Sequence, residues 1–167
     1  MSKKYKLREV PPKKVFEKLK AYNEFTRSLL FVRGIETEEE AERFLSPNYD
    51  IHLHDPYLLK DMGKAVKRIL KAIEKKEKVA IFSDYDADGI PGAVVLHDFF
   101  QKIGFTNFIN YIPLRNEEGF GLNNDAITTL HKDKVTLIIT IDCGISNVEQ
   151  VEHANKYGID VIITDHH

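Results

Sequence analysis

The sequence predicts an α/β fold with an open, mostly parallel sheet, helices on both of its faces and a helical segment in front. From residue 79 onward, short apolar runs alternate with helical stretches, which is typical of βαβ units that build a parallel sheet. Before residue 79, apolar side chains recur near the 3.6-residue period of an α-helix. We therefore expect a helical leader at residues 1–78 that packs on the core, and an α/β core at residues 79–167.

Three helices are expected in the leader. Residues 13–33 follow two prolines, carry apolar side chains at helical spacing and precede a glycine, which indicates the first helix. Thr37 and Glu40 have the spacing of a capping box, so a second helix should run to about Leu45. After a loop, residues 61–76 are apolar on one face and mostly lysine on the other, which predicts the third helix.

The core should hold four strands joined by three helices. The strands are expected at residues 79–83, 108–112, 135–141 and 160–164, and the helices at 91–103, 123–131 and 146–157. Pro91 suits the first position of a helix, and Gly104 and Gly158 suit the ends of two others. Right-handed crossovers between parallel strands would place helices on both faces of the sheet.

Charge and cysteine content narrow the function classes. The 24 basic and 26 acidic side chains exclude a protein that binds nucleic acid through bulk positive charge. The charges are divided unevenly, because residues 1–80 hold 19 basic and 13 acidic side chains and residues 81–167 hold 5 and 13. Cys143 has no intramolecular disulfide partner and the N-terminus has no apolar signal core, so we expect a cytoplasmic protein. No apolar run approaches the roughly 18 residues of a membrane span, which predicts no membrane contact.

Three of the four expected strands end in aspartate: Asp84, Asp142 and Asp165. Because the carboxyl ends of parallel strands share one edge of a sheet, these side chains should converge there. Crowded carboxylates make one another costly to ionise, and a bound cation relieves this cost. Oxygen ligands suit magnesium or manganese, and an imidazole from His166 or His167 would favour manganese over calcium.

The first acidic cluster, residues 84–89, also has the acid spacing at the start of an EF-hand calcium loop. The twelfth position of such a loop would be Val95 instead of a bidentate glutamate, which argues against calcium. Helix capping and turn formation are the alternative roles of Asp86 and Asp88, and this alternative is strongest for Asp88. The free backbone amides that follow the cluster can also hold a phosphate.

The final three residues, Asp165, His166 and His167, bring one acid and two imidazoles together. Neighbouring residues at a strand end point in different directions, so one histidine can bind a metal while the other meets a phosphate. An ordinary exposed group at the end of the chain is the alternative.

These motifs together resemble the DHH phosphoesterase superfamily, most closely the RecJ single-stranded-DNA exonucleases. Residues 84–89 resemble the first motif of that family, residues 141–146 the second, and residues 165–167 the third. Parts of residues 41–66 are similar to the RecJ leader, and residues 112–122 to the loop after its second strand. The resemblance extends over most of the chain, and the order and spacing of the motifs make it specific.

The resemblance implies a two-metal phosphodiesterase, dependent on Mn²⁺ or Mg²⁺, that degrades single-stranded DNA from its 5′ end to mononucleotides in repair and recombination. Carried over by position, Asp84, Asp86, Asp142 and His166 would be metal ligands, with Asp142 between the two ions. His167 would face the scissile phosphate.

Arg115 would be a further substrate contact, because a guanidinium forms paired hydrogen bonds with phosphate. An ion pair with Glu117 or Glu118 is its alternative role. Single-stranded DNA is the implied partner, with a single-stranded-DNA-binding protein or a helicase as further partners. The basic leader would then guide the DNA strand toward the site.

The chain departs from the family at Pro91, where a hydroxyl residue is common, and at Ser83, where glycine is frequent. RecJ proteins also continue beyond the third motif, to another metal-binding aspartate, the remainder of the DHH domain and C-terminal DHHA1 and OB-type domains. We therefore expect an incomplete core that binds manganese weakly and has little or no nuclease activity alone.

Three other functions stay open. A DHH-type hydrolase of oligonucleotides, cyclic dinucleotides or pyrophosphate would use the same metal site. A non-catalytic RecJ-like scaffold would keep only the fold. A haloacid-dehalogenase-type phosphatase would use two aspartates after the first strand, but it prefers threonine or valine at Asp88 and leaves residues 165–167 unexplained.

Overall fold

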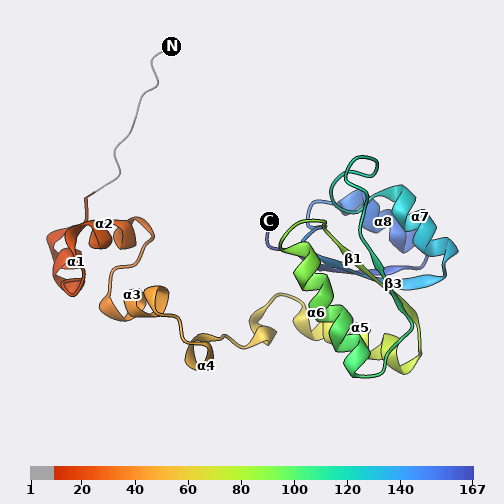
Figure 1. The fold of residues 1–167 in the computed structure, drawn as a ribbon, viewed down its shortest axis with the longest axis horizontal. Helices are drawn as coiled ribbons and strands as arrows, with labels where there is room; N and C mark the ends of the chain where they lie inside the picture. Colours follow the sequence, from red (N-terminus) through yellow and green to blue (C-terminus); the bar gives the residue numbers. More distant parts are fainter. Residues whose placement is uncertain (1–9) are drawn as a thin grey trace, which may run out of the picture. The chain divides into compact units, whose positions relative to one another are not determined.

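The computed structural model describes residues 10–167, which form two compact units that meet in the sequence between Leu58 and Leu59 (Figure 1). This boundary precedes the expected limit of the leader at residue 78, because helix α5 belongs to the second unit. Residues 1–9, which contribute to the expectation of no signal segment, lie outside the described part. None of the helices described is long and apolar enough to cross a membrane.

The first unit is built from short helices around a small apolar cluster. Its elements are α1 (Lys13–Lys18), α2 (Glu24–Val32), α3 (Glu38–Leu45), α4 (Tyr49–His52) and the 3₁₀ turn η1 (Pro56–Leu58). The cluster is formed by Val15, Leu19, Leu30 and Ala41. The capping box at the start of α3 is confirmed, with Glu40 N–H donating to Thr37 Oγ1 at 3.3 Å and Thr37 N–H donating to Glu40 Oε2 at 3.1 Å.

The prediction of one helix over residues 13–33 is wrong, because the chain turns between α1 and α2. The Asn23 side chain caps α2 by accepting a hydrogen bond from Thr26 N–H at 2.9 Å. Arg27 closes the turn by donating to the carbonyl oxygens of Tyr22 and Lys20. The Asn23 cap and the two local hydrogen bonds of Arg27 therefore override the continuous apolar periodicity.

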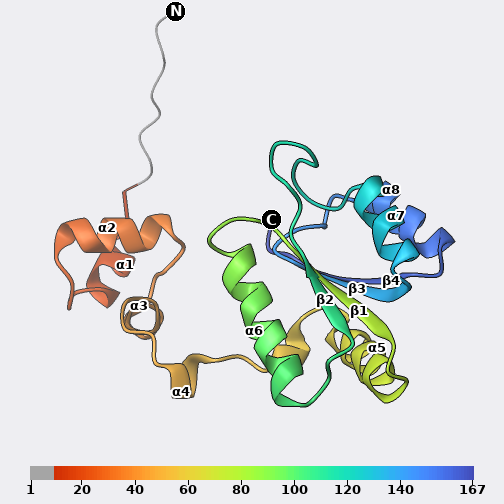
Figure 2. The same ribbon diagram turned by 45° about the vertical axis from the view of Figure 1, so that its right-hand side comes forward.

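The second unit contains a four-stranded sheet in which all neighbouring strands are parallel, which confirms the predicted α/β class (Figures 1 and 2). The strands are β1 (Lys78–Ser83), β2 (Phe108–Tyr111), β3 (Val135–Ile141) and β4 (Asp160–Thr164), in the order β2-β1-β3-β4. Ser83 is paired with Ile141, and Ile141 with Thr164, so β1, β3 and β4 end at the same level.

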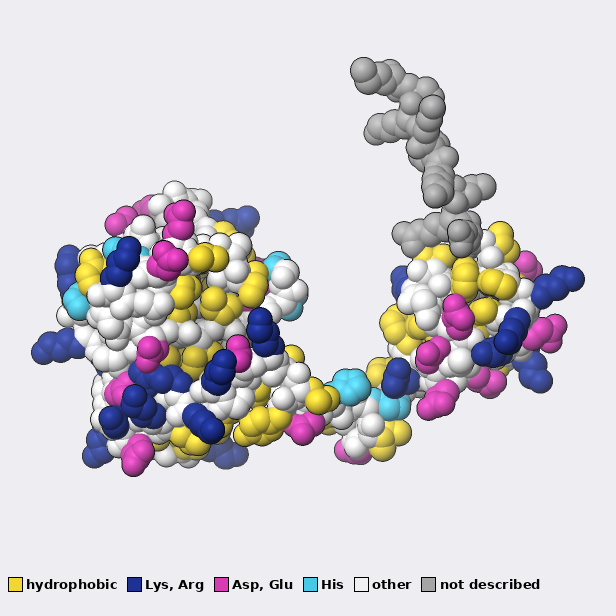
Figure 3. Space-filling view, turned by 180° about the vertical axis from the view of Figure 1, so that it is seen from behind, with side chains coloured by type: hydrophobic (Ala, Val, Ile, Leu, Met, Phe, Trp, Pro, Cys, Tyr) yellow, Lys and Arg dark blue, Asp and Glu magenta, His cyan; other side chains and the backbone are white. Residues whose placement is uncertain are grey.

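Helices cover both faces of the sheet, as predicted (Figure 2). Helices α5 (Met62–Glu74) and α6 (Gly89–Lys102) lie on one face, and α7 (Asn124–Lys132) and α8 (Val148–Lys156) on the other. Each face of the sheet has its own hydrophobic core, and alternate residues of β1 pack into one or the other. Val79 and Ile81 pack on the side of α5 and α6, and Ala80 and Phe82 pack on the side of α7 and α8. The outer side of α5 carries exposed lysines, and Figure 3 shows basic side chains gathered on this part of the unit.

Helix α6 begins at Gly89, two residues before the predicted start at Pro91. Proline is tolerated there because the N–H groups of the first helical turn have no partner within the helix.

Arg68 connects three segments at the end of the sheet where the strands begin. Its guanidinium lies 2.7 Å from Glu77 Oε2, and it also bonds Asp160 at the start of β4 and the carbonyl oxygen of Thr136 in β3. Burial alone would raise the pKa of Glu77, but hydrogen bonds from Arg68 and from the Thr136 hydroxyl outweigh burial and lower it. The ionised glutamate therefore stabilises the folded state above the pKa of the unfolded chain.

We expect Arg68→Met to lower the unfolding free energy by about 2 kcal/mol at pH 7, because Glu77 would be left charged and half-buried without its cation. The loss should shrink as the pH falls below about 4 and through the lowered folded-state pKa of Glu77, because the carboxyl group is then neutral in both states. Urea unfolding at several pH values measures the effect. Lys67→Met, on the exposed side of α5, is the matched control, and an equal loss in both variants would contradict the role of Arg68.

Candidate metal centre

The acidic residues lie at the carboxyl edge of the sheet, where the strand order reverses. The chain passes from β1 to β2 on one side and returns to β3 on the other, which leaves a switch point between β1 and β3. Asp84 follows β1 and Asp142 follows β3. Backbone hydrogen bonds hold both, from Asp84 N–H to the Ile141 carbonyl at 3.2 Å and from Asp142 N–H to the Thr164 carbonyl at 2.8 Å.

Two groups of ligand atoms form at this edge, and Asp142 belongs to both. Asp84, Asp86 and Asp142 each contribute one carboxylate oxygen to the first group, and Asp142, His166 and His167 form the second. Within each group the ligand atoms lie within 4.8 Å of one another. Asp84 and Asp142 are 2% and 7% exposed, so two carboxylates are withdrawn from water at this edge.

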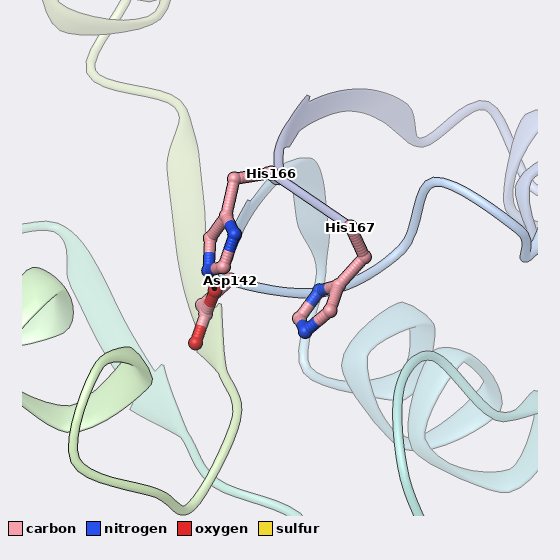
Figure 4. A group of neighbouring side chains, drawn as sticks. All are labelled: Asp142, His166 and His167. Atoms are coloured by element: carbon pink, nitrogen blue, oxygen red, sulfur yellow. Dashed lines mark ion pairs between the residues drawn. The ribbon is translucent and has the colours of Figure 1, made fainter. Parts of the chain in front are cut away.

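The two histidines approach Asp142 from the end of β4 (Figure 4). His166 Nε2 lies 2.9 Å from Asp142 Oδ1, and the two imidazole rings are stacked with 4.6 Å between their centroids. Asp142 Oδ1 is buried. It contacts His166 but has no other hydrogen-bond partner among the described residues. A buried carboxylate oxygen without such partners is costly, and coordination of a cation would remove this cost. The donor set therefore fits a divalent metal.

Asp86 both belongs to the first group and closes the turn before α6. Its Oδ1 accepts hydrogen bonds from the N–H groups of Asp88 and Gly89, at 2.9 and 3.0 Å. These bonds lower the pKa of Asp86 below its ordinary value. Asp88 is exposed at the N-cap of α6, makes no side-chain cap bond and belongs to neither group.

Asp165 also lies outside both groups. It fixes the backbone of the segments after β3 and β4 through hydrogen bonds. Its carboxylate accepts from Ile145 N–H at 2.9 Å and from His167 N–H at 3.0 Å, and it lies 2.7 Å from His167 Nδ1. Burial alone would raise the pKa of Asp165, but these hydrogen bonds outweigh burial and lower it to about 2. The same contact raises the pKa of His167 and leaves its Nε2 free to face a ligand.

Arg115 lies over an aromatic ring of the first motif. Its guanidinium carbon is 5.3 Å from the centroid of the Tyr85 ring, and the alternative ion pair with Glu117 or Glu118 does not form in the described structure. Phe120, in the same loop, meets the His167 ring edge to face at 6.0 Å. Neither aromatic contact was predicted, although Arg115 and Phe120 both lie in residues 112–122, the segment that resembles the RecJ loop after the second strand.

Cys143 is fully buried beside Asp142. Burial, together with the charges of Asp84, Asp165 and Asp142, raises its pKa to about 12. The side chain therefore stays a neutral thiol.

The fold and the site together define the class of protein, an all-parallel α/β domain with a candidate divalent-metal site of acids and histidines at its carboxyl edge. The family described as "DHH family, N-terminal domain" matches residues 78–167, just over half of the chain. The chain belongs to this family.

RecJ proteins are among the relatives of the chain. The chain is 42% identical over 140 residues to the single-stranded-DNA-specific exonuclease RecJ of Bacillus subtilis, and 32% identical over 141 residues to that of Escherichia coli. Each match covers 84% of this chain but only 18% and 24% of the relative. The chain thus spans about a fifth of the length of these relatives.

Two solved structures agree with the fold. A manganese-bound exonuclease RecJ is 32% identical, with a TM-score of 0.60 over 65% of this chain and 28% of the other. RecJ of Thermus thermophilus in complex with Mn²⁺ is 24% identical, with a TM-score of 0.63 over 95% of this chain and 22% of the other. The first supports the relationship to RecJ, and the second shows the shared fold.

Proposed function

We propose that this chain supplies the first part of a metal-dependent phosphodiesterase that degrades single-stranded DNA from the 5′ end and releases mononucleotides. The observation that carries the proposal is the place of Asp142 in both ligand groups at the carboxyl edge of the sheet. The relatives are named as single-stranded-DNA-specific exonucleases, and this name supports the substrate class. A role in DNA repair and recombination, and a cytoplasmic location, belong to the same proposal.

Asp84, Asp86, Asp142 and His166 would hold Mn²⁺ or Mg²⁺, with Asp142 shared between two ions. The carboxylate oxygens suit either cation, and the imidazole favours manganese. Two solved RecJ structures hold manganese, which supports this choice. When bound, such ions activate water and neutralise the charge that develops on a phosphoryl group.

The remaining residues would bind and orient the substrate. His167, fixed by Asp165, would donate a hydrogen bond from Nε2 to the scissile phosphate, and Arg115 would contact a phosphate through its planar guanidinium. The lysines of α5 would attract the DNA backbone electrostatically. The basic helical leader would form a wall beside the strand, and a single-stranded-DNA-binding protein or a helicase would deliver the substrate.

Titration of the purified chain with Mn²⁺ in an isothermal titration calorimeter tests the metal site. We expect weak but saturable binding, and a folded sample that binds no Mn²⁺ would instead support a non-catalytic scaffold. We expect little hydrolysis by the 167 residues alone, since the relatives are several times longer. Rapid Mn²⁺-dependent digestion would overturn that expectation.

The substrate class is tested on a version of the protein as long as the RecJ relatives. A 5′-phosphorylated single strand, a dinucleotide and pyrophosphate are compared under the same Mn²⁺ concentration. Preferential cleavage of the long strand supports the exonuclease, whereas preference for either small substrate would assign the site to a DHH-type hydrolase of small phosphate esters or anhydrides.

A further inference from the structure

The loop at residues 112–123, between β2 and α7, touches two of the motif segments that form the site. Arg115 lies over the Tyr85 ring of the first motif. Phe120 meets the His167 ring of the third motif. The placement of this loop therefore decides where its only arginine and its only phenylalanine stand relative to the metal-ligand groups.

One carboxylate joins the two ends of this loop. Glu118 Oε1 accepts a hydrogen bond from the Tyr111 hydroxyl at 2.6 Å, and Glu118 Oε2 accepts from Leu114 N–H at 2.7 Å. Asn123 Nδ2 donates to Oε1 at 3.3 Å. Tyr111 is the last residue of β2, Leu114 lies near the start of the loop and Asn123 is the N-cap of α7, so the carboxylate links both elements that the loop connects.

The protonation states favour this link at neutral pH. Burial alone would raise the pKa of Glu118, but the hydrogen bonds from Tyr111, Leu114 and Asn123 outweigh burial and lower it. Burial and the bond with Glu118 raise the pKa of Tyr111 to about 12. An ionised acceptor therefore faces a protonated donor, and hydrogen bonds to a charged acceptor are the stronger kind.

A second contact fixes the loop to the segment after β3. Asn147 Oδ1 accepts a hydrogen bond from Leu122 N–H at 3.2 Å. Gly121 has φ +77°, and a Cβ at this position would stand 2.6 Å from Asn147 Oδ1. The backbone of the loop therefore approaches Asn147 more closely than a residue with a side chain would allow.

We propose that Glu118 is a positioning residue of the site: its carboxylate fixes the 112–123 loop so that Arg115 and Phe120 face the metal-ligand groups. The inference rests on the proposed function, because it assumes that those groups hold the metal and the phosphate. The geometry of the loop itself can be measured without metal, so the two proposals are tested separately.

The test compares Glu118→Ala and Glu118→Gln in the isotope-labelled chain by NMR spectroscopy. In the metal-free protein we expect nuclear Overhauser contacts between the Phe120 and His167 rings, and between the Arg115 side chain and the Tyr85 ring. Glu118→Ala should abolish both. Glu118→Gln keeps one acceptor oxygen, so it should restore them in part.

Glu117→Ala is the matched control, because Glu117 is an exposed neighbour with the same charge and no side-chain bond in the described structure. It should leave both contacts unchanged. Ring contacts in the core between Phe100 and Phe105, which lie 5.1 Å apart, report whether each variant is folded. If Glu118→Ala does not fold, Tyr111→Phe removes one of the three donors and should weaken the same two contacts. Unchanged loop contacts in every folded variant would overturn the proposal.

Mn²⁺ then shows whether the positioned loop faces a metal. In the parent chain, bound Mn²⁺ should broaden the amide signals of residues 84–89 and 143–147 together with those of residues 115–120. In Glu118→Ala the broadening of residues 115–120 should weaken relative to that of residues 84–89 and 143–147, because the released loop lies farther from the ion on average. If Mn²⁺ broadens no signal in the parent, the proposed function fails, while the metal-free contacts still decide whether Glu118 places the loop.

Discussion

Replacing Asp142 by asparagine is expected to lower the affinity for Mn²⁺ by more than about 100-fold, beyond the 10- to 100-fold effect typical of groups that only support ligands. Asp142 is the residue shared by both ligand groups, so its carboxylate serves both proposed ions. Calorimetric titration of the parent and the variant measures the loss.

Asparagine is the informative replacement because of the backbone at this position. Asp142 has φ +60°, in the left-handed region that asparagine tolerates better than other residues with a side chain. The variant therefore removes the charge without adding backbone strain, and it also removes one of two buried carboxylates that face each other. In the absence of metal, its unfolding free energy should stay within about 1 kcal/mol of the parent or rise.

Asp88→Asn is the control for the change in charge, because Asp88 is exposed at the N-cap of α6, four residues after Asp84, and belongs to neither ligand group. It should leave the affinity for Mn²⁺ within a few-fold of the parent. Equal affinity in the parent and in Asp142→Asn would mean that any bound metal lies elsewhere.

The core was predictable because helices cover both faces of the sheet, so its strands read as short apolar runs; the central strands β1 and β3 are buried along most of their length. The observed β3 and β4 have the predicted bounds, and the observed β1 and β2 differ from them by one residue. In the leader, the turn between α1 and α2 depends on Arg27 reaching back to the carbonyl oxygens of Tyr22 and Lys20. Periodicity does not encode such a contact. The short helix α4 and the turn η1 were expected as loop, since only four and three residues form them.

At the candidate metal centre, the ligand groups were predictable because the sequence places an aspartate directly after three strands. Parallel strands end at the same edge of the sheet, so these aspartates lie close to one another. The structure brings Asp84, Asp86, Asp142, His166 and His167 together, and leaves Asp88 and Asp165 outside the groups.

The supporting contacts of the site are less visible in the sequence. Asp165 fixes Ile145, twenty positions earlier, and Asn147 meets Leu122 across twenty-five. Hydrogen bonds over such separations depend on how the loops fold against one another, and a single sequence contains no pattern that reveals them.

Replacing Gly89 by alanine is expected to have the largest effect on stability, a loss of about 3 kcal/mol, at the upper end of the cost of overpacking. A Cβ at this buried position would stand 2.6 Å from the carbonyl oxygen of Asp84. That contact is with backbone, so the clash is relieved only if the turn between β1 and α6 moves. Because the Asp84 carboxylate belongs to the first group of candidate ligand atoms, the same movement should weaken Mn²⁺ binding even at temperatures where the variant stays folded.

Gly63→Ala is the matched control for this glycine, because Gly63 also lies in the first turn of a helix but a Cβ there meets nothing within 4 Å. Alanine is the better helix former, so this variant should gain up to about 1 kcal/mol. Urea unfolding and Mn²⁺ titration of both variants separate the two effects of Gly89. A stable Gly89→Ala protein with parental Mn²⁺ affinity would show that the close approach of α6 to Asp84 is not required. Loss of stability with unchanged affinity would show that the approach supports the fold but does not place the ligand.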